Sequence, residues 1–199
     1  MVGRTLDFCP FGTGGSDTFI LIDGSLKKVL VPGIIGCITG WNKKTFVALN
    51  ISYSNGRNLC GWPMLFACRA ILEHGEFQYE NASSFHVSVF DGYQKRRLSF
   101  GQGENNTRQD ITSCNRTMTT LNFNYGLFDA DKNTADSLSR QKVINDNPYL
   151  DMLSLLRHPL INVYDTINSI VYDYDTGIVT LRRNNSFASD EAEYVEFRV

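Results

Sequence analysis

Apolar and polar positions alternate over short stretches of the chain, and this period of two predicts β-strands joined by tight turns. Four strand pairs are expected, at 18–22 with 27–31, 34–39 with 45–51, 85–90 with 95–100 and 161–172 with 177–182. Turn sequences such as Asp23-Gly24 and Asp91-Gly92 lie between paired runs and favour hairpins, and residues 40–43 serve as the turn of the second pair. Single strands are expected at 118–125 and 193–199.

Two segments change to a helical period of apolar positions. Residues 63–74 contain helix-forming residues, with Pro63 at the start and Gly75 directly after the end. Residues 134–156 are expected to be mostly helical, with an interruption near Asn147-Pro148. Mostly antiparallel strands with two helical segments indicate the α+β class, in one domain over residues 1–199.

Composition narrows the classes of function. The chain has 199 residues, 42% of them apolar, which is enough for a core without disulfides. Its 19 basic and 21 acidic residues give no electrostatic reason to bind nucleic acid. No apolar run is long enough for a membrane-spanning helix, and the first residues lack the apolar stretch of a signal peptide. A cytoplasmic location is therefore slightly favoured, and a secreted or lysosomal one if upstream sequence is missing.

Cysteines and glycosylation sequons leave the compartment open. The five cysteines are an odd number, so at least one lies outside any disulfide within the chain. No Cys-x-x-Cys motif occurs, which excludes zinc-ribbon and thioredoxin-type sites, and most of the thiols are expected to be buried. Five sequons, a mild excess, are compatible with secretion without establishing it. They lie at Asn50, Asn81, Asn105, Asn115 and Asn184.

Several motifs fail on inspection, so no metal or organic cofactor is expected. The glycine-rich stretch 11–15 lacks the Gly-Lys-Ser/Thr of a phosphate loop and is interpreted as a mobile loop. A calcium loop starting at Asp129 would need Gly where Thr134 stands and Glu where Arg140 stands. The three histidines have no metal-ligand spacing. Residues 173–177, Asp-Tyr-Asp-Thr-Gly, are typical of a hairpin turn.

Six short motifs, each weak alone, follow one another in a fixed order. They are residues 3–8 (GRTLDF), 32–42 (PGIIGCITGWN), 49–73 with Leu-Asn, Gly-Trp-Pro and Arg-Ala-Ile-Leu-Glu, 119–122 (TTLN), 136–140 (DSLSR) and 166–169 (TINS). This order resembles the N-terminal-nucleophile (Ntn) hydrolases of the choloylglycine hydrolase, penicillin V acylase and acid ceramidase-like group. The resemblance runs from residue 3 to about 185 and is strongest to the acyl-CoA:6-aminopenicillanic acid acyltransferase-like branch.

The resemblance implies a fold and a reaction. The fold would be a four-layer αββα sandwich of two mainly antiparallel sheets, with the first strand missing from this chain. The activity would be hydrolysis of linear, non-peptide amide C–N bonds, or the matching acyl transfer, on a small-molecule acyl amide. A cysteine at the N-terminus attacks the carbonyl as thiolate, and its own α-amine, with a pKa near working pH, acts as base.

The family's functional residues match five positions of this chain. Arg4 would lie beside the nucleophile and favour its thiolate, and Asp7 would orient the α-amine. Asn42 and Asn122 would contribute to the oxyanion hole, and Arg140 would close the polar network. For Arg140 the alternative is a solvated arginine after a helix cap.

The other matched positions have structural alternatives as well. Arg4 and Asp7 could form an ordinary surface ion pair. Asn42 could be plain hairpin-turn chemistry. Asn122 could be an exposed strand residue, and Asn124 takes its oxyanion role if the register differs by two residues.

No residue of this chain matches the N-terminal cysteine that is the family's nucleophile. Met1 is no nucleophile, and Cys9 lies beyond Asp7, where it is interpreted as a buried or loop thiol. Three readings follow: a fragment of an active amidohydrolase, a non-catalytic homologue that binds acyl amides or other proteins, or a subunit whose missing strand comes from a partner. The last implies an exposed sheet edge that a second copy could cover. An α+β domain of other ancestry is the remaining alternative.

Overall fold

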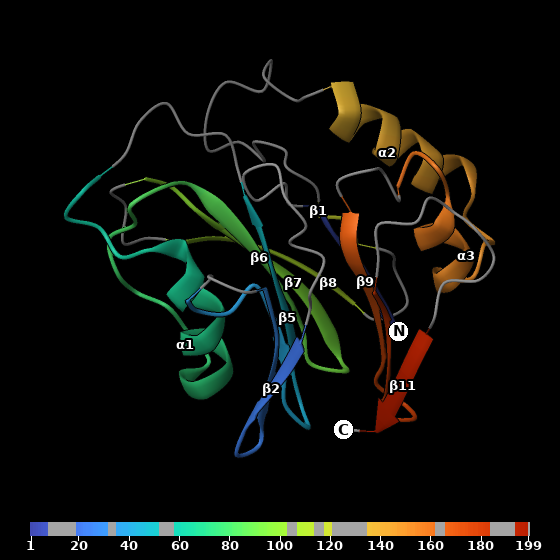
Figure 1. Cartoon of the computed structure of the whole chain (residues 1–199). Helices are drawn as coiled ribbons and strands as arrows, with labels where there is room; N and C mark the ends of the chain where they lie inside the picture. The colour runs from blue at the N-terminus through green and yellow to red at the C-terminus, as the bar shows by residue number, and fades with distance from the viewer. Residues whose placement is uncertain are drawn as a thin grey trace. The chain divides into compact units, whose positions relative to one another are not determined.

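The chain forms two antiparallel sheets and a few helices (Figure 1). The computed structural model describes residues 1–7, 19–31, 35–51, 58–102, 107–113, 118–120, 135–161, 166–183 and 194–198. Its contacts define two compact units: unit 1 is Met1–Ile20, Leu30–Ile34 and Ser139–Val199, and unit 2 is Leu21–Val29 and Ile35–Leu138. The α+β class with two antiparallel sheets is confirmed, and the single domain over 1–199 stays a prediction.

The larger sheet has seven strands whose spatial order follows the sequence, β2-β3-β4-β5-β6-β7-β8. The strands are β2 (Phe19–Asp23), β3 (Leu26–Leu30), β4 (Thr39–Trp41), β5 (Phe46–Ile51), β6 (Phe85–Phe90), β7 (Gln94–Phe100) and β8 (Thr107–Ser113). A 3₁₀ turn, η1 (Met64–Phe66), leads into α1 (Ala67–His74) between β5 and β6. The predicted helix over 63–74 is thus confirmed, and Gly75 ends it in the left-handed region.

The seven-stranded sheet is buried on both faces at its central strands β4 and β5. At Gly40 there is no room for a side chain, because an added Cβ would lie 2.9 Å from Cδ1 of Leu72 on α1. Val47 pairs with Gly40 and so shares its α1-facing side, where it is fully buried. The opposite side holds Trp41 and Phe46, which pair with each other and are also fully buried. Helix α1 therefore covers one face of the sheet at β4 and β5, where both faces hold buried apolar side chains.

Strand β4 begins later than predicted. The run 34–39 was expected to be a strand, yet the strand starts only at Thr39 and includes two residues assigned to the turn. The physical reason is a contact with the segment before α1. Gly36 has a φ of +122°, and the amide of Cys37 donates to the carbonyl of Leu65 at 2.8 Å instead of joining the ladder.

Strand β8 was not predicted, because its sequence is largely polar and lacks a clear apolar face. It is held to β7 by the ladder and by an ion pair in which Arg97 contacts Asp110. Residues 118–120 are not in a strand, which corrects part of the predicted strand at 118–125. The remainder of that strand and the glycine-rich stretch 11–15 lie outside the described residues.

The smaller sheet belongs to unit 1 and has the order β1-β9-β10-β11. Its strands are β1 (Val2–Asp7), β9 (Thr166–Asp173), β10 (Ile178–Arg183) and β11 (Tyr194–Arg198). The hairpin between β9 and β10 is confirmed, with the Thr176 hydroxyl donating to Asp173 at 2.8 Å and Gly177 at a φ of +66°. The predicted helical region divides at Asn147-Pro148 into α2 (Ala135–Asp146) and α3 (Met152–Arg157).

Helix α3 packs against one face of the smaller sheet. A Cβ at Gly3 would collide with the side chain of Met152, so glycine allows α3 to approach β1 closely. Val171, which pairs with Gly3, joins Leu156 in a small apolar cluster on this face. Ile170 points to the opposite face, where it is fully buried. The smaller sheet is therefore buried on both faces at β9.

The contact between Gly36 and Leu65 can be tested with two alanine variants. Gly36 and Gly75 both have positive φ, +122° and +84°, where a side chain costs about 1–2 kcal/mol. At Gly36 an added Cβ would also lie 2.6 Å from that of Leu65, whereas the space at Gly75 is open. We expect Gly36→Ala to lower the free energy of unfolding in urea by about 1–3 kcal/mol more than Gly75→Ala. If both variants lose the same free energy of unfolding, the segment at Leu65 can move to accept the added Cβ without cost.

The N-cap of α3 predicts a pH dependence. Asp151 accepts hydrogen bonds from the hydroxyl and the amide of Ser154, and these hold the pKa of its carboxyl below the ordinary value of 3.8. A lowered folded pKa stabilises the protein above pH 3.8, and this stabilisation is lost as the pH falls through the folded pKa. Thermal unfolding over a pH series should therefore show Asp151→Ala less stable than wild type at pH 7, with a gap that narrows below pH 3.8.

The control for this test is Asp151→Asn, which keeps an acceptor oxygen without the charge. It should lose less stability than the alanine variant at pH 7. A gap between Asp151→Ala and wild type that stays constant down to pH 3 would contradict the assignment.

Candidate functional site

Arg4 lies in the middle of β1, which is an edge strand. Among the described strands β1 pairs with β9 alone. Arg4 pairs with Ile170, one residue away from the pair of Gly3 and Val171 that faces α3. The half-buried Arg4 side chain therefore points to the face away from α3, beside the buried Ile170.

The ladder between β1 and β9 changes register directly before Asp7. Leu6 pairs with Asn168, but Asp7 pairs with Thr166, so one residue of β9 is skipped. Such irregularities re-aim the chain and are frequent beside active sites. The backbone of Asp7 therefore lies opposite Thr166, two residues before Asn168 on β9. The carboxylate of Asp7 lies outside the described part of the structure.

Strand β9 has buried polar side chains where it approaches the end of β1. Thr166 and Asn168 are each only 2% exposed. Polar side chains are rarely this deeply buried in an ordinary core, because desolvation is unfavourable. Asn168 is two residues from Ile170, the partner of Arg4, so it shares the face of Arg4 and makes this part of β9 a candidate site.

Arg140 lies in α2 and is half-buried, with its Nε atom buried. Arg140 is therefore not the fully solvated arginine after a helix cap that was the alternative to a functional role. Arg140 belongs to unit 1, as do Arg4 and Asp7. Three of the five matched residues are therefore in one unit, two of them on the same strand.

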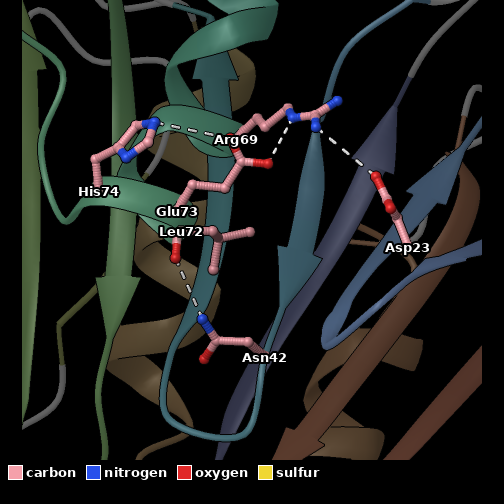
Figure 2. A network of polar contacts seen from close by, with 6 residues as sticks. All are labelled: Asp23, Asn42, Arg69, Leu72, Glu73 and His74. Atoms are coloured by element: carbon pink, nitrogen blue, oxygen red, sulfur yellow. Dashed lines mark hydrogen bonds and ion pairs between the residues drawn. The ribbon is translucent and has the colours of Figure 1, made fainter.

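Asn42 lies in unit 2, in the turn between β4 and β5. Its Oδ1 accepts from the amides of Lys44 and Thr45, both at 2.8 Å. Its Nδ2 donates to the carbonyl of Leu72 near the end of α1, at 3.3 Å (Figure 2). The two contacts of Oδ1 are those expected of a hairpin-turn residue. The contact of Nδ2 also links the turn to α1.

The same view shows a chain of charged contacts on the surface of α1 (Figure 2). Arg69 lies between Glu73 at 2.7 Å and Asp23 at 3.7 Å, and His74 lies 3.9 Å from Glu73. All four side chains are at least one-third exposed, so the contacts are solvent-screened and each contributes little to stability. We interpret the network as a link between α1 and the end of β2.

The remaining candidates are partly outside the described structure. Asn122 and its alternative Asn124 lie outside the described residues, as do Cys9 and Cys114. Of the other cysteines, Cys37 and Cys68 are buried and Cys60 is exposed. In the described ranges, no group of three or more His, Cys, Asp or Glu side chains is placed to hold a metal ion.

The structure also bears on two sequons. Asn81 is fully buried, and its Nδ2 donates to the carbonyl of Gly101 at 3.0 Å, so it is no glycan acceptor in the folded chain. Asn50 is half-buried, with its Nδ2 3.5 Å from the carbonyl of Thr120. The other three sequons lie outside the described residues.

A hollow under α3 in unit 1 was not predicted from the sequence. Ser169, Arg157 and Arg182 are among the residues that line it. Ser169 belongs to the last of the six motifs, but a motif match does not show which face of a strand a side chain occupies. Only the cross-strand pairing of Ser169 with Arg182 brings these two residues together.

Comparisons of this chain with protein-family models and with curated proteins find no match. No helix in the described ranges is long and apolar enough to cross a membrane. The family assignment therefore rests on the order of the motifs and stays a prediction.

The role of Asn42 in its turn can be tested by substitution. Asn42→Ala removes two acceptor contacts and one donor contact, so the free energy of unfolding should fall by about 1–2 kcal/mol in urea denaturation. Asn42→Ser keeps a hydroxyl that can replace part of the turn contacts, and it should lose less. If Asn42→Ala unfolds at the wild-type urea concentration, the turn does not depend on this amide.

Proposed function

We propose that this chain belongs to a cysteine amidohydrolase or acyltransferase of the Ntn type, acting on linear, non-peptide amides. The proposal includes an αββα arrangement, in which the two sheets pack face to face. It is supported by two antiparallel sheets whose central strands are buried on both faces, with a helix against one face of each. A sheet with one helical and one non-helical buried face suits the inner layers of a sandwich.

The observation that carries the proposal is the arrangement on β1. Arg4 lies on the face away from α3, and the register change places the backbone of Asp7 opposite Thr166 on β9. Arg4 and Asp7 are the residues that the resemblance assigns to the nucleophile and to its α-amine. A cation beside a thiol stabilises the thiolate, and an acid beside an amine orients it.

The proposed reaction proceeds through a thioester. The thiolate of the N-terminal cysteine attacks the amide carbonyl, and the oxygen becomes an oxyanion that needs preorganised donors. The α-amine, which has taken the proton of the thiol, passes it to the nitrogen of the leaving amine, and the C–N bond breaks. Water then hydrolyses the thioester to a carboxylic acid, or an acceptor amine takes the acyl group. The cysteine would come from polypeptide that precedes Arg4.

Among the described strands β1 pairs only with β9, so its other edge is where such a segment could pair. The further strand would come from upstream polypeptide or from a second copy of the chain. The expected homo-oligomer through a sheet edge is therefore part of the proposal.

A second candidate function is supported by Asn42. Its amide oxygen is used by two turn amides, and its Nδ2 is used by the carbonyl of Leu72. An oxyanion hole needs an amide directed at the substrate instead. A non-catalytic homologue that binds acyl amides or another protein would keep the fold without this requirement.

The decisive test uses the protein purified from its native source, with the N-terminus determined by sequencing. It should release acid from at least one of penicillin V, conjugated bile salts and fatty acyl amides. Arg4→Gln should lower kcat/KM by about 100-fold, because it removes the cation beside the thiolate. Arg198→Gln, which makes the same charge change at an exposed position on β11, should leave kcat/KM unchanged.

The outcomes separate the two candidates. Calorimetric binding of the same amides without turnover would overturn the enzyme and favour the binding protein. An absence of both turnover and binding would overturn both functions.

A further inference from the structure

Three aromatic side chains gather on the surface of unit 2, beside the start of α1. They are Trp62, Phe66 and Tyr79, and we call them the aromatic platform. The rings of Trp62 and Tyr79 lie 5.0 Å apart at an angle of 36°, and Phe66 meets Trp62 edge-on at 6.1 Å. Trp62 is 48% exposed and Tyr79 is 49% exposed, so both rings are available to a partner. Large apolar groups that touch one another at the surface are typical of an interaction site.

The platform is held in place by its own backbone and by the core. The amide of Trp62 donates to the carbonyl of Glu80 at 2.8 Å, and the carbonyl of Trp62 accepts from the amide of Ala82 at 3.0 Å. The ring of Phe77, which is only 4% exposed, lies 5.2 Å from the ring of Tyr79. Because these groups are already fixed, little conformational entropy is lost when a partner covers them.

The charges around the platform define the kind of partner. Residues 58–82 include three glutamates, one histidine and one arginine, and two carboxylates already pair with that arginine. Glu76 precedes Tyr79 by three residues and Glu80 follows it directly, and both glutamates are exposed. Aromatic ring faces attract cations, and the nearby carboxylates add a negative field. This surface therefore favours a cationic partner and disfavours a membrane of anionic lipids.

Arginine is the cation that best suits two neighbouring rings at an open surface. Its planar guanidinium group can stack on a ring while its N–H groups donate to a carboxylate. A quaternary ammonium group is instead recognised by a cage of rings around it. We propose that the aromatic platform binds an arginine-bearing segment of a partner protein. The platform belongs to unit 2, whereas Arg4 and Asp7 belong to unit 1, so this inference does not depend on the proposed amidase function.

The test uses fluorescence, because the chain has two tryptophans and the other one, Trp41, is fully buried. Acrylamide quenches exposed tryptophans and therefore reports on Trp62. The probe is the peptide acetyl-Gly-Leu-Arg-Leu-Arg-Gly-amide, which at saturation should lower the quenching constant by about two-fold, because a stacked guanidinium covers the exposed ring. A control peptide with citrulline, the uncharged isostere of arginine, should leave quenching unchanged at the same concentration.

Variants of the surface assign the contact. Tyr79→Ala should weaken binding of the arginine peptide by about two- to five-fold, the size of an exposed cation–π contact. Glu76→Gln together with Glu80→Gln should weaken binding as well and make it less sensitive to salt. The matched control is Tyr93→Ala, which removes another exposed tyrosine of unit 2, in the turn between β6 and β7, and should bind as wild type does.

Three results would overturn the proposal. If the citrulline peptide protects Trp62 as well as the arginine peptide does, the platform recognises an apolar partner. If the arginine peptide gives no protection, the proposal is wrong, and protection by phosphatidylcholine vesicles or by cellohexaose would then show that the surface binds a lipid or a sugar. If Trp62 resists acrylamide in the protein alone and becomes accessible on dilution, a second copy of the chain covers the platform.

Discussion

The antiparallel pairing of β1 with β9 is the contact on which unit 1 depends. It joins residues near the start of the chain to residues more than 150 positions later, so forming it requires closing a very long loop. The register of this pairing also sets the chemistry of both faces. Shifting it by one residue would exchange the faces, turning Arg4 toward α3 and Gly3 away from it. The close approach of α3 therefore requires that Gly3, and no larger residue, face the helix.

Unit 2 is built in a different way. Its strand order follows the sequence, so most of its pairings are hairpins with short loops. The exception is the segment that carries α1, which leaves the sheet after β5 and returns at β6. Two backbone carbonyls near this helix hold it to the sheet, Leu65 by the amide of Cys37 and Leu72 by the side chain of Asn42. These contacts place the turn of Asn42 beside the helix.

The two faces of β9 differ in their chemistry. Asn168 lies on the face of Arg4, and its neighbour Ser169 lies on the face of α3. Alternation along β9 therefore separates a buried polar region beside Arg4 from a cationic hollow beneath the helix. Both regions place polar groups where an ordinary core would be apolar.

The sequence by itself determined the elements whose signals are local. The Asp-Gly turns, the helix end at Gly75 and the break at Asn147-Pro148 were predicted, because turn and cap residues act on their own backbone. Tertiary structure decided the rest. Strand β8 has no clear apolar face and is stabilised by its pairing with β7. Strand β4 starts at Thr39 because the amide of Cys37 donates to the carbonyl of Leu65. Residues distant in the chain likewise decide three further features: the contacts of the Asn42 amide, the register change at Asp7 and the hollow at Ser169. No local pattern encodes such contacts, because they form only when separate segments pack together.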